Sequence, residues 1–192
     1  MKNVIIIGAS GQIAKHVIDI LIKEDDINLT LFLRKESRLR NNNVSKCSIV
    51  EGDVMDYESL KDAISGQDIV YVNLAGELEA MTRYIVKAMS ETGVKRIIAI
   101  SSIGIYNTPL RTVLIPYRKL ADVIEASDLE YTILRPTWFT NVEEVDYEIT
   151  SKGEPEKGSV ISQKSLATFI TEIIEQPEMY ARKNLGINKP NS

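Results

Sequence analysis

The segment from Val4 to Ala14 constrains the fold more than any other part of the chain. An apolar, β-branched run at Val4–Ile7 leads into Gly8–Gly11, and an amphipathic helical pattern follows at once. A buried strand that passes through a glycine turn into a helix N-terminus is how a doubly wound sheet builds a pyrophosphate site. The segment therefore predicts an α/β fold that binds a phosphate-bearing ligand at its first turn.

Apolar runs and helical patterns then alternate along the chain. Parallel strands that are covered on both faces read as continuous apolar runs. Such runs occur at Val4–Ile7, Leu29–Leu33, Ile49–Val50, Ile69–Val72, Ile97–Ile100 and Tyr131–Leu134. Helical patterns cover Ile13–Leu21, Asp56–Ile64, Leu78–Glu91, Arg118–Ala126 and Lys164–Glu175. This alternation predicts a Rossmann-type, doubly wound parallel sheet with its ligand crevice at the carboxyl ends of the strands.

The segment Glu144–Ser162 interrupts the alternation. It carries Gly153, Pro155 and Gly158 among charged residues, with strand-like pieces at 147–150 and 160–162. We expect a small, irregular C-terminal region beside the main sheet. The chain of 192 residues is then a single domain, residues 1–192, in which about residues 137–162 contribute the substrate side.

Composition excludes several classes of protein. The formal charge of −4 does not suit a nucleic-acid partner, which needs a basic surface. No run of about 18 apolar residues predicts a membrane span. One cysteine, Cys47, and one histidine, His16, are too few for a metal site, and a lone cysteine suits a reducing compartment. We expect a cytoplasmic protein, either a monomer or a homodimer, that acts on a small molecule.

The glycine turn, residues 8–11, carries the pattern G-x-x-G-x-x-A that ends at Ala14. Gly8 permits a tight turn, Gly11 permits close approach of the backbone to a pyrophosphate, and Ala14 permits close helix packing. We therefore predict that residues from this turn and the first helical positions hold the pyrophosphate: Gly8, Ala9, Ser10, Gly11, Gln12 and Ile13. The alternative is a tight turn without a ligand.

Arg34 ends the second predicted strand, where an NAD site places a carboxylate that binds the ribose 2′-hydroxyl. A guanidinium there accommodates a 2′-phosphate instead. With Arg38 close behind, the sequence predicts NADP(H) over NAD(H). The alternative is a solvated basic loop.

Residues after the third and fourth strands complete the predicted cofactor site. Asp53 and Val54 follow the third strand, and the carboxylate of Asp53 can accept from an adenine amino group. An N-cap role is the alternative for Asp53, although Asp56 suits that role better. Small residues after the fourth strand leave room for the ribose, and those assigned to the site are Leu74, Ala75 and Gly76.

Candidate catalytic groups follow the fifth strand. Ser101 and Ser102 end that strand. Ser101 is predicted to contact the cofactor and Ser102 to polarise a substrate carbonyl, with capping or turn bonding as the alternative. Lys119 is a candidate for the nicotinamide ribose and Tyr117 for proton donation, with a packing aromatic as the alternative for Tyr117. His16 is expected on a solvated edge of the first helix, without a catalytic role.

The sixth strand ends in Pro136, and two aromatic residues, Trp138 and Phe139, follow it. A rigid proline and aromatic rings can wall a nicotinamide and a flat substrate. The alternative is a bend that packs in the core. The predicted cofactor contact is Pro136, and the predicted substrate contacts are Tyr106, Trp138, Phe139 and Tyr147.

Together these motifs resemble the atypical short-chain dehydrogenase/reductases of the NAD(P)H-binding, NmrA-like type, including biliverdin and flavin reductase-like relatives. The resemblance covers most of the chain and rests on residues 8–14, Arg34 and Arg38, and the segments 51–54, 100–102 and 131–136. It implies a Rossmann fold with a small C-terminal substrate region, and a serine matching Ser102 near the chemistry.

One departure leaves two functions open. Catalytic members of the wider superfamily carry Tyr-x-x-x-Lys, but Ile115 stands four residues before Lys119 and Ala121 stands four residues after Tyr117. Two kinds of relatives lack that motif: reductases that stack cofactor and substrate, and regulators that bind the dinucleotide and catalyse little. The leading hypothesis is an NADP(H)-dependent oxidoreductase with a small, flat acceptor, and the alternative is an NADP(H)-binding redox sensor.

Overall fold

A computed structural model describes residues 1–40 and 43–192. Over these residues the chain forms an eight-stranded sheet in the order β3-β2-β1-β4-β5-β6-β10-β8. Every pairing in it is parallel except that of β8 with β10. The strands are β1 (Lys2–Ile7), β2 (Ile27–Leu33), β3 (Ser48–Glu51), β4 (Ile69–Val72), β5 (Arg96–Ile100), β6 (Glu130–Pro136), β8 (Glu148–Ser151) and β10 (Lys183–Asn188). The order 3-2-1-4-5-6 is that of a Rossmann fold, as predicted.

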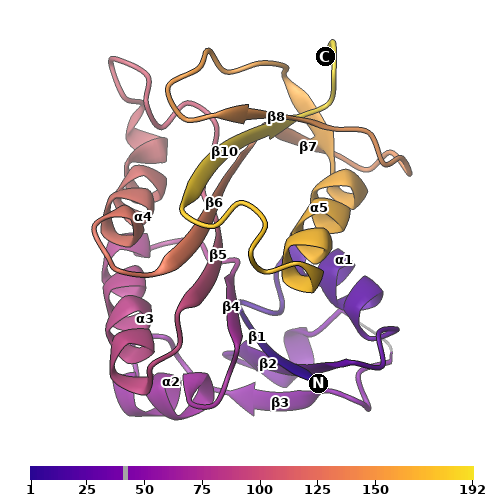
Figure 1. Cartoon of the computed structure of the whole chain (residues 1–192), viewed down its shortest axis with the longest axis vertical. Coiled ribbons are helices and arrows are strands. Elements are labelled where there is room, and N and C mark those ends of the chain that lie inside the picture. The colour runs from indigo at the N-terminus through magenta and orange to yellow at the C-terminus, as the bar shows by residue number, and fades with distance from the viewer. Residues whose placement is uncertain (41–42) are drawn as a thin grey trace.

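Helices cover both faces of this sheet (Figure 1). They are α1 (Gln12–Leu21), α2 (Tyr57–Ile64), α3 (Leu78–Thr92), α4 (Ile115–Glu125) and α5 (Gln163–Glu175), with short 3₁₀ turns η1 (Glu36–Arg38) and η2 (Thr112–Leu114). Helices α1 and α5 pack together on one face, while α2, α3 and α4 form a layer on the other. This is the two-sided arrangement that right-handed crossovers produce.

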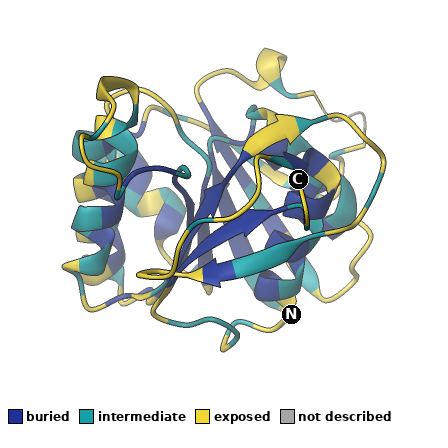
Figure 2. Cartoon of the chain, turned by 90° about the horizontal axis from the view of Figure 1, so that it is seen from above, coloured by how far each residue is buried: buried dark blue, intermediate teal, exposed yellow. Residues whose placement is uncertain are grey.

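The first strand shows why the sheet is buried on both sides. Val4–Ile7 are all 0% exposed. Side chains alternate along a strand, so Val4 and Ile6 join the core beneath α1 and α5, whereas Ile5 and Ile7 join the core beneath α2, α3 and α4. In Figure 2 the central strands are accordingly dark blue between partly exposed helices. The continuous apolar run was therefore a correct signal of a doubly covered parallel strand.

The C-terminal part departs from the prediction. The strand-like piece expected at 147–150 is β8, but it lies within the main sheet, paired to β10, and not beside it. No strand was predicted after Pro177, so β10 was missed. A separate parallel pair joins β7 (Trp138–Thr140) to β9 (Val160–Ser162), next to the carboxyl end of β6. Strands β7, β8 and β9 therefore come from the part of the chain, about residues 137–162, that was predicted to contribute the substrate side.

Among the described residues, no helix combines the length and apolar character needed to cross a bilayer. The same residues contain no cluster of three or more histidine, cysteine or acidic side chains placed to hold a metal ion.

Candidate functional site

A cleft of about 1420 Å³ lies along the carboxyl ends of the strands. It runs from the ends of β2 and β3, past the glycine turn after β1, to the β7 residues that follow β6. The predicted site residues that line it are Gly8, Ser10, Gly11, Gln12, Ile13, Arg34, Asp53, Val54, Leu74, Ala75, Ser101, Ser102, Tyr106, Tyr117, Pro136, Trp138 and Phe139. The structure thus brings residues from most of the chain to one edge of the sheet.

The glycine turn packs against Asn73, the residue after β4. Gly8 has a φ of +87°, and a Cβ there would lie 2.2 Å from the Asn73 carbonyl oxygen. A Cβ on Gly11 would lie 2.2 Å from the Asn73 side-chain nitrogen, Nδ2. Only glycine fits at either position without a shift of its neighbours. Asn73 lines the cleft but was not assigned to the site, although its place directly after a strand was visible in the sequence.

The N-terminus of α1 opens onto this turn. Gly11 is the N-cap residue, and no side chain caps the helix. The first backbone N–H groups of a helix have no partner within the helix, and they attract anions together with the helix dipole. The uncapped end beside Gly8 and Gly11 therefore suits a pyrophosphate.

The basic residues after β2 lie at one end of the cleft. Arg34 lines it, and neither Arg34 nor Arg38 forms an ion pair with any described residue. Arg38 lies in η1 and is exposed, but it does not line the cleft. No carboxylate follows β2 directly, so the donors present fit a 2′-phosphate better than a ribose hydroxyl.

Asp53 lines the same end of the cleft and shapes its own turn. Its Oδ1 accepts from the backbone N–H of Met55 at 2.9 Å. The N-cap of α2 is Asp56, whose Oδ1 accepts from the N–H of Ser59. The alternative N-cap role for Asp53 is therefore wrong, and Asp53 remains at the cleft wall.

The two serines after β5 have different environments. The buried Ser101 donates from its hydroxyl to the backbone carbonyl of Tyr117 at 3.0 Å, and so ties the start of α4 to the sheet. Ser102 is half-buried and donates to the carbonyl of its neighbour Ile103 at 3.2 Å. Tyr117 and Ser102 both line the cleft, on the β5 and α4 side.

Lys119 does not reach the cleft, which corrects its predicted role. Residues two apart on a helix point about 200° apart, so Tyr117 and Lys119 face nearly opposite sides of α4. The Lys119 ammonium lies 3.7 Å from a carboxylate oxygen of Glu79 on α3, in an exposed pair. Tyr117 and Lys119 therefore do not form a tyrosine–lysine pair in the cleft.

Tyr147 is also outside the cleft. Its hydroxyl donates to Glu172 of α5 at 2.6 Å, and its ring packs on Phe169 of the same helix. Burial and the Glu172 carboxylate raise the pKa of Tyr147. The prediction of a substrate contact was wrong because the segment before β8 folds under α5.

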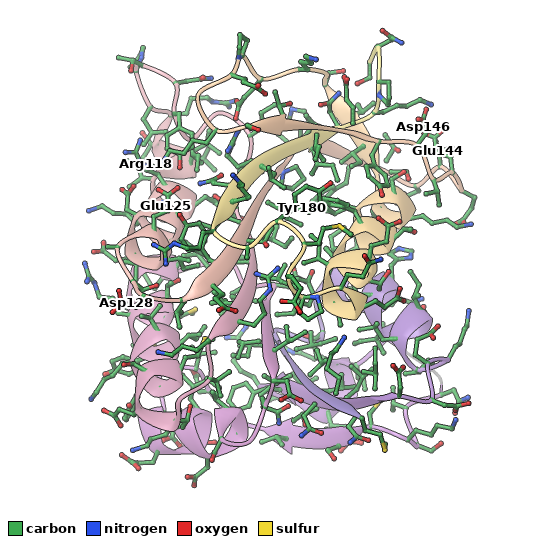
Figure 3. The ribbon with its side chains drawn as sticks, in the orientation of Figure 1. Arg118, Glu125, Asp128, Glu144, Asp146 and Tyr180 are labelled. Atoms are coloured by element: carbon green, nitrogen blue, oxygen red, sulfur yellow. The ribbon has the colours of Figure 1, made fainter. Side chains whose placement is uncertain are left out.

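Tyr106 lines the cleft, and both its hydroxyl and its ring have partners. The hydroxyl accepts from the side-chain amide of Asn184 at 2.8 Å, and the ring lies 4.8 Å from both the Arg118 guanidinium and the Lys152 ammonium. Arg118 and Glu125 both project from α4 (Figure 3), and Glu125 accepts from Lys152 and Asn184. Burial, then Glu125, raise the pKa of Tyr106, so the phenol stays neutral.

Three further positions differ from their predictions. Ala9 is buried beneath the turn and Gly76 lies in the turn after β4, and neither lines the cleft. His16 is not on a solvated edge: its Nε2 lies 3.1 Å from the Gln163 side-chain oxygen on α5.

The cleft is also lined by residues that were not predicted to belong to the site. Arg135, at the end of β6, is 1% exposed, and the loop between β8 and β9 contributes residues 153–156. Arg111 and Val113 lie on the rim opposite, before α4. No local pattern marks these residues, because they meet only through the tertiary fold.

The strand order and the position of the cleft at the glycine turn are those of an NAD(P)-binding Rossmann fold. The chain belongs to the NAD(P)H-binding family, whose model matches residues 8–177. A Rossmann-fold NAD(P)-binding family protein from Shigella flexneri has a TM-score of 0.93 at 46% identity, over 100% of this chain and 95% of that one. A short-chain dehydrogenase/reductase from Veillonella parvula, solved in complex with NADP, has a TM-score of 0.91 at 27% identity, over 99% and 95%.

Curated proteins also match this chain. An isoflavone reductase homologue from Nicotiana glauca is 26% identical over 218 residues, which cover 98% of this chain and 69% of the relative. Membership of the family makes NAD(P)H the cofactor class of this chain, and its relatives include proteins named as reductases.

Proposed function

We propose that this chain is an NADPH-dependent oxidoreductase that transfers hydride to a small, flat acceptor. The observation that carries the proposal is the single cleft that joins the glycine turn to Trp138 and Phe139. Its volume of about 1420 Å³ exceeds the roughly 300–1,000 Å³ of an ordinary small-molecule pocket. That volume leaves room for a dinucleotide and a second molecule beside it.

The cofactor half is assigned from the donors that the cleft offers. The uncapped end of α1 beside Gly8 and Gly11 suits the pyrophosphate, and Arg34 suits the 2′-phosphate. Asp53 lies at the adenine end, and Pro136 and Ser102 lie at the opposite end. The Veillonella relative, solved with NADP, supports this choice of cofactor.

The acceptor half has an apolar and aromatic rim. Trp138 is 73% exposed, Phe139 is 42% exposed and Val113 is 63% exposed, yet all three line the cleft. Exposed aromatic side chains at a concave site mark a place where a flat molecule gains contact area. When bound, the nicotinamide supplies the hydride, while the cleft residues orient the acceptor and limit the access of water.

Protonation of a reduced acceptor is assigned to Tyr117 or to solvent. Tyr117 is the phenol on the β5 side of the cleft, and its backbone is held by Ser101. Ser102 is within the same wall and orients the acceptor through its hydroxyl. These roles need no lysine, which agrees with the position of Lys119 outside the cleft.

The position of Lys119 outside the cleft also favours a second function, that of a redox sensor. Because Tyr117 and Lys119 do not act together in the cleft, the chain could bind NADPH and report the oxidation state of the cofactor to another molecule without turnover. NADPH oxidation measured against a panel of quinones, flavins and aldehydes separates the two functions. Turnover with any acceptor, abolished by Gly11→Trp, supports the oxidoreductase. Tight NADPH binding with no turnover across the panel would overturn it in favour of the sensor.

A further inference from the structure

The loop that joins β8 to β9, residues 152–159, forms one wall of the cleft, and we call it the strap. It has no regular secondary structure, and all of its residues, which the structure describes in full, are exposed except Glu156. Its ends are fixed by the strands that flank it. Glu156 is therefore the point at which the middle of the strap turns inward.

The carboxylate of Glu156 joins three separate parts of the cleft wall. Its Oε1 accepts from the Nε of Arg135 at 3.0 Å, and its Oε2 accepts from the backbone N–H of Gly104 at 2.8 Å. Arg135 ends β6, and Gly104 lies in the turn after β5. One side chain thus connects the strap to both strands that border the acceptor half.

The partner of Glu156 is deeply buried. Arg135 is 1% exposed, while Glu156 is 20% exposed. Among the described residues, Glu156 is the sole ion-pair partner of Arg135, and Asn184 on β10 accepts from the same guanidinium. A buried guanidinium that loses its carboxylate is strongly disfavoured, so this pair favours the closed strap.

The second partner of Glu156, the N–H of Gly104, lies close to Ser102 in the sequence. Gly104 is two residues from Ser102, and both line the cleft. A bond from the Gly104 N–H therefore fixes the turn that carries Ser102 in place. Glu154, on the same strap, differs: its carboxylate accepts only from the N–H of Ser151, within its own turn, among the contacts of the described residues.

We propose that Glu156 is a positioning residue that latches the strap across the acceptor half of the cleft, with its carboxylate seated between Arg135 and the N–H of Gly104. This contact holds the strap in place beside the acceptor. It also occupies the cradle formed by the Arg135 guanidinium and the Gly104 N–H, so that carboxylates of other molecules do not bind there. The kinetic part rests on the proposed function, whereas the latch itself is testable without turnover.

The strap carries its own reporters. Trp138 is the single tryptophan, and its backbone N–H donates to the carbonyl of Ser159 at the end of the strap. Lys152 and Lys157 are exposed trypsin sites within it. Tryptophan emission and the rate of tryptic cleavage therefore measure the state of the strap directly.

In Glu156→Ala we expect a change in tryptophan emission, and cleavage at Lys152 and Lys157 faster by about tenfold, because loss of the pair raises the open population. Sodium acetate should reverse both changes by filling the empty cradle, whereas sodium chloride at equal ionic strength should not. Glu154→Ala, the matched control, should give wild-type emission and cleavage. Wild-type cleavage of Glu156→Ala, or equal effects of acetate and chloride, would overturn the latch.

Glu156→Gln provides a second variant if Glu156→Ala does not fold. The amide oxygen still accepts one bond but carries no charge, so we expect intermediate cleavage and no response to acetate. Wild-type cleavage of this variant would count against the ion pair as the source of the latch.

Kinetics supply the functional readout. With an acceptor that turns over, Glu156→Ala should raise the KM for the acceptor about tenfold and leave the Kd for NADPH within about twofold, with acetate restoring the KM. An unchanged KM would overturn the positioning role. If no acceptor turns over, the proposed function fails, while the cleavage and emission data still decide the latch.

Discussion

Asn73 occupies the space that a side chain on Gly11 would need. A Cβ on Gly11 would lie 2.2 Å from the Nδ2 of Asn73, and the carbonyl of the same Asn73 lies as close to a Cβ on Gly8. The glycine turn is therefore shaped by its contact with the end of β4 as well as by the ligand that it suits. The two glycines therefore differ: a side chain on Gly8 would overlap first with the backbone of Asn73, whereas a side chain on Gly11 would overlap first with the side chain of Asn73.

Gly8→Ala should destabilise the chain more than Gly11→Ala. Gly8 has a φ of +87°, where a side chain costs about 1–2 kcal/mol before the overlap with backbone is counted. Gly11 has a φ of −69°, which any residue adopts, and its alanine would overlap mainly with the side-chain amide of Asn73, with the Gly8 carbonyl oxygen next at 3.2 Å. Urea unfolding measures both losses. In the Gly11→Ala background, Asn73→Ala should recover stability, and strictly additive losses would contradict the contact.

Arg34→Gln should weaken the binding of NADPH without changing that of NADH. Loss of a charge-assisted bond to a 2′-phosphate costs about 1.5–3 kcal/mol, or roughly 10–150-fold in Kd. Arg83→Gln, which removes an exposed partner of Glu79 on α3, should leave both affinities unchanged. Calorimetric titration with both cofactors provides the measurement. An equal loss for NADH and NADPH would contradict recognition of the 2′-phosphate.

Lys119→Ala should leave NADPH binding and turnover within about twofold, because exposed ion pairs contribute only about 0–1 kcal/mol.

Tyr117→Phe should lower kcat by about 10²-fold or more if the phenol donates the proton. The two variants change the same turn of α4, so each controls for the other. A large loss in Lys119→Ala would show that the ammonium reaches the cleft after all.

The parts of the fold that could be predicted are those that a local pattern encodes. The strands β1, β2, β4, β5 and β6 are continuous apolar runs because helices cover both of their faces. Strand β10 was missed because its sequence, KNLGIN, contains two asparagines and a glycine, which are uncommon in strands. Its partners β6 and β8 supply the hydrogen bonds that hold it.

The site residues likewise fall into those that a local pattern marks and those that only the tertiary fold brings together. The turn at Gly8 and the place of Arg34 follow from strand ends, which the sequence marks. The opposite directions of Tyr117 and Lys119 were also available from helical periodicity. The contact of Arg135 with Glu156 was not, because it joins β6 to an irregular loop, and only the packed fold brings the two together.

The last prediction concerns the hydroxyl of Tyr71, in the middle of the sheet. Tyr71 is 0% exposed, and no described residue is a hydrogen-bond partner for its hydroxyl. Removing an unpaired buried hydroxyl relieves its desolvation cost, so Tyr71→Phe should stabilise the chain by about 1 kcal/mol and raise the Tm by roughly 2–4 °C. Tyr147→Phe is the matched control: its hydroxyl donates to Glu172, so its loss should destabilise by about 1 kcal/mol.

The dependence of stability on alkaline pH also tests whether the Tyr71 hydroxyl is buried. Burial raises the pKa of Tyr71 well above its ordinary value of 10.0. Above about pH 10 the unfolded chain releases this proton while the folded chain keeps it, so stability falls by about 1.4 kcal/mol per pH unit for this group. Tyr71→Phe removes that contribution and should flatten the decline, as followed by urea unfolding between neutral and alkaline pH. A decline as steep as that of the wild type would mean that Tyr71 ionises in the folded chain and is not sealed within the sheet.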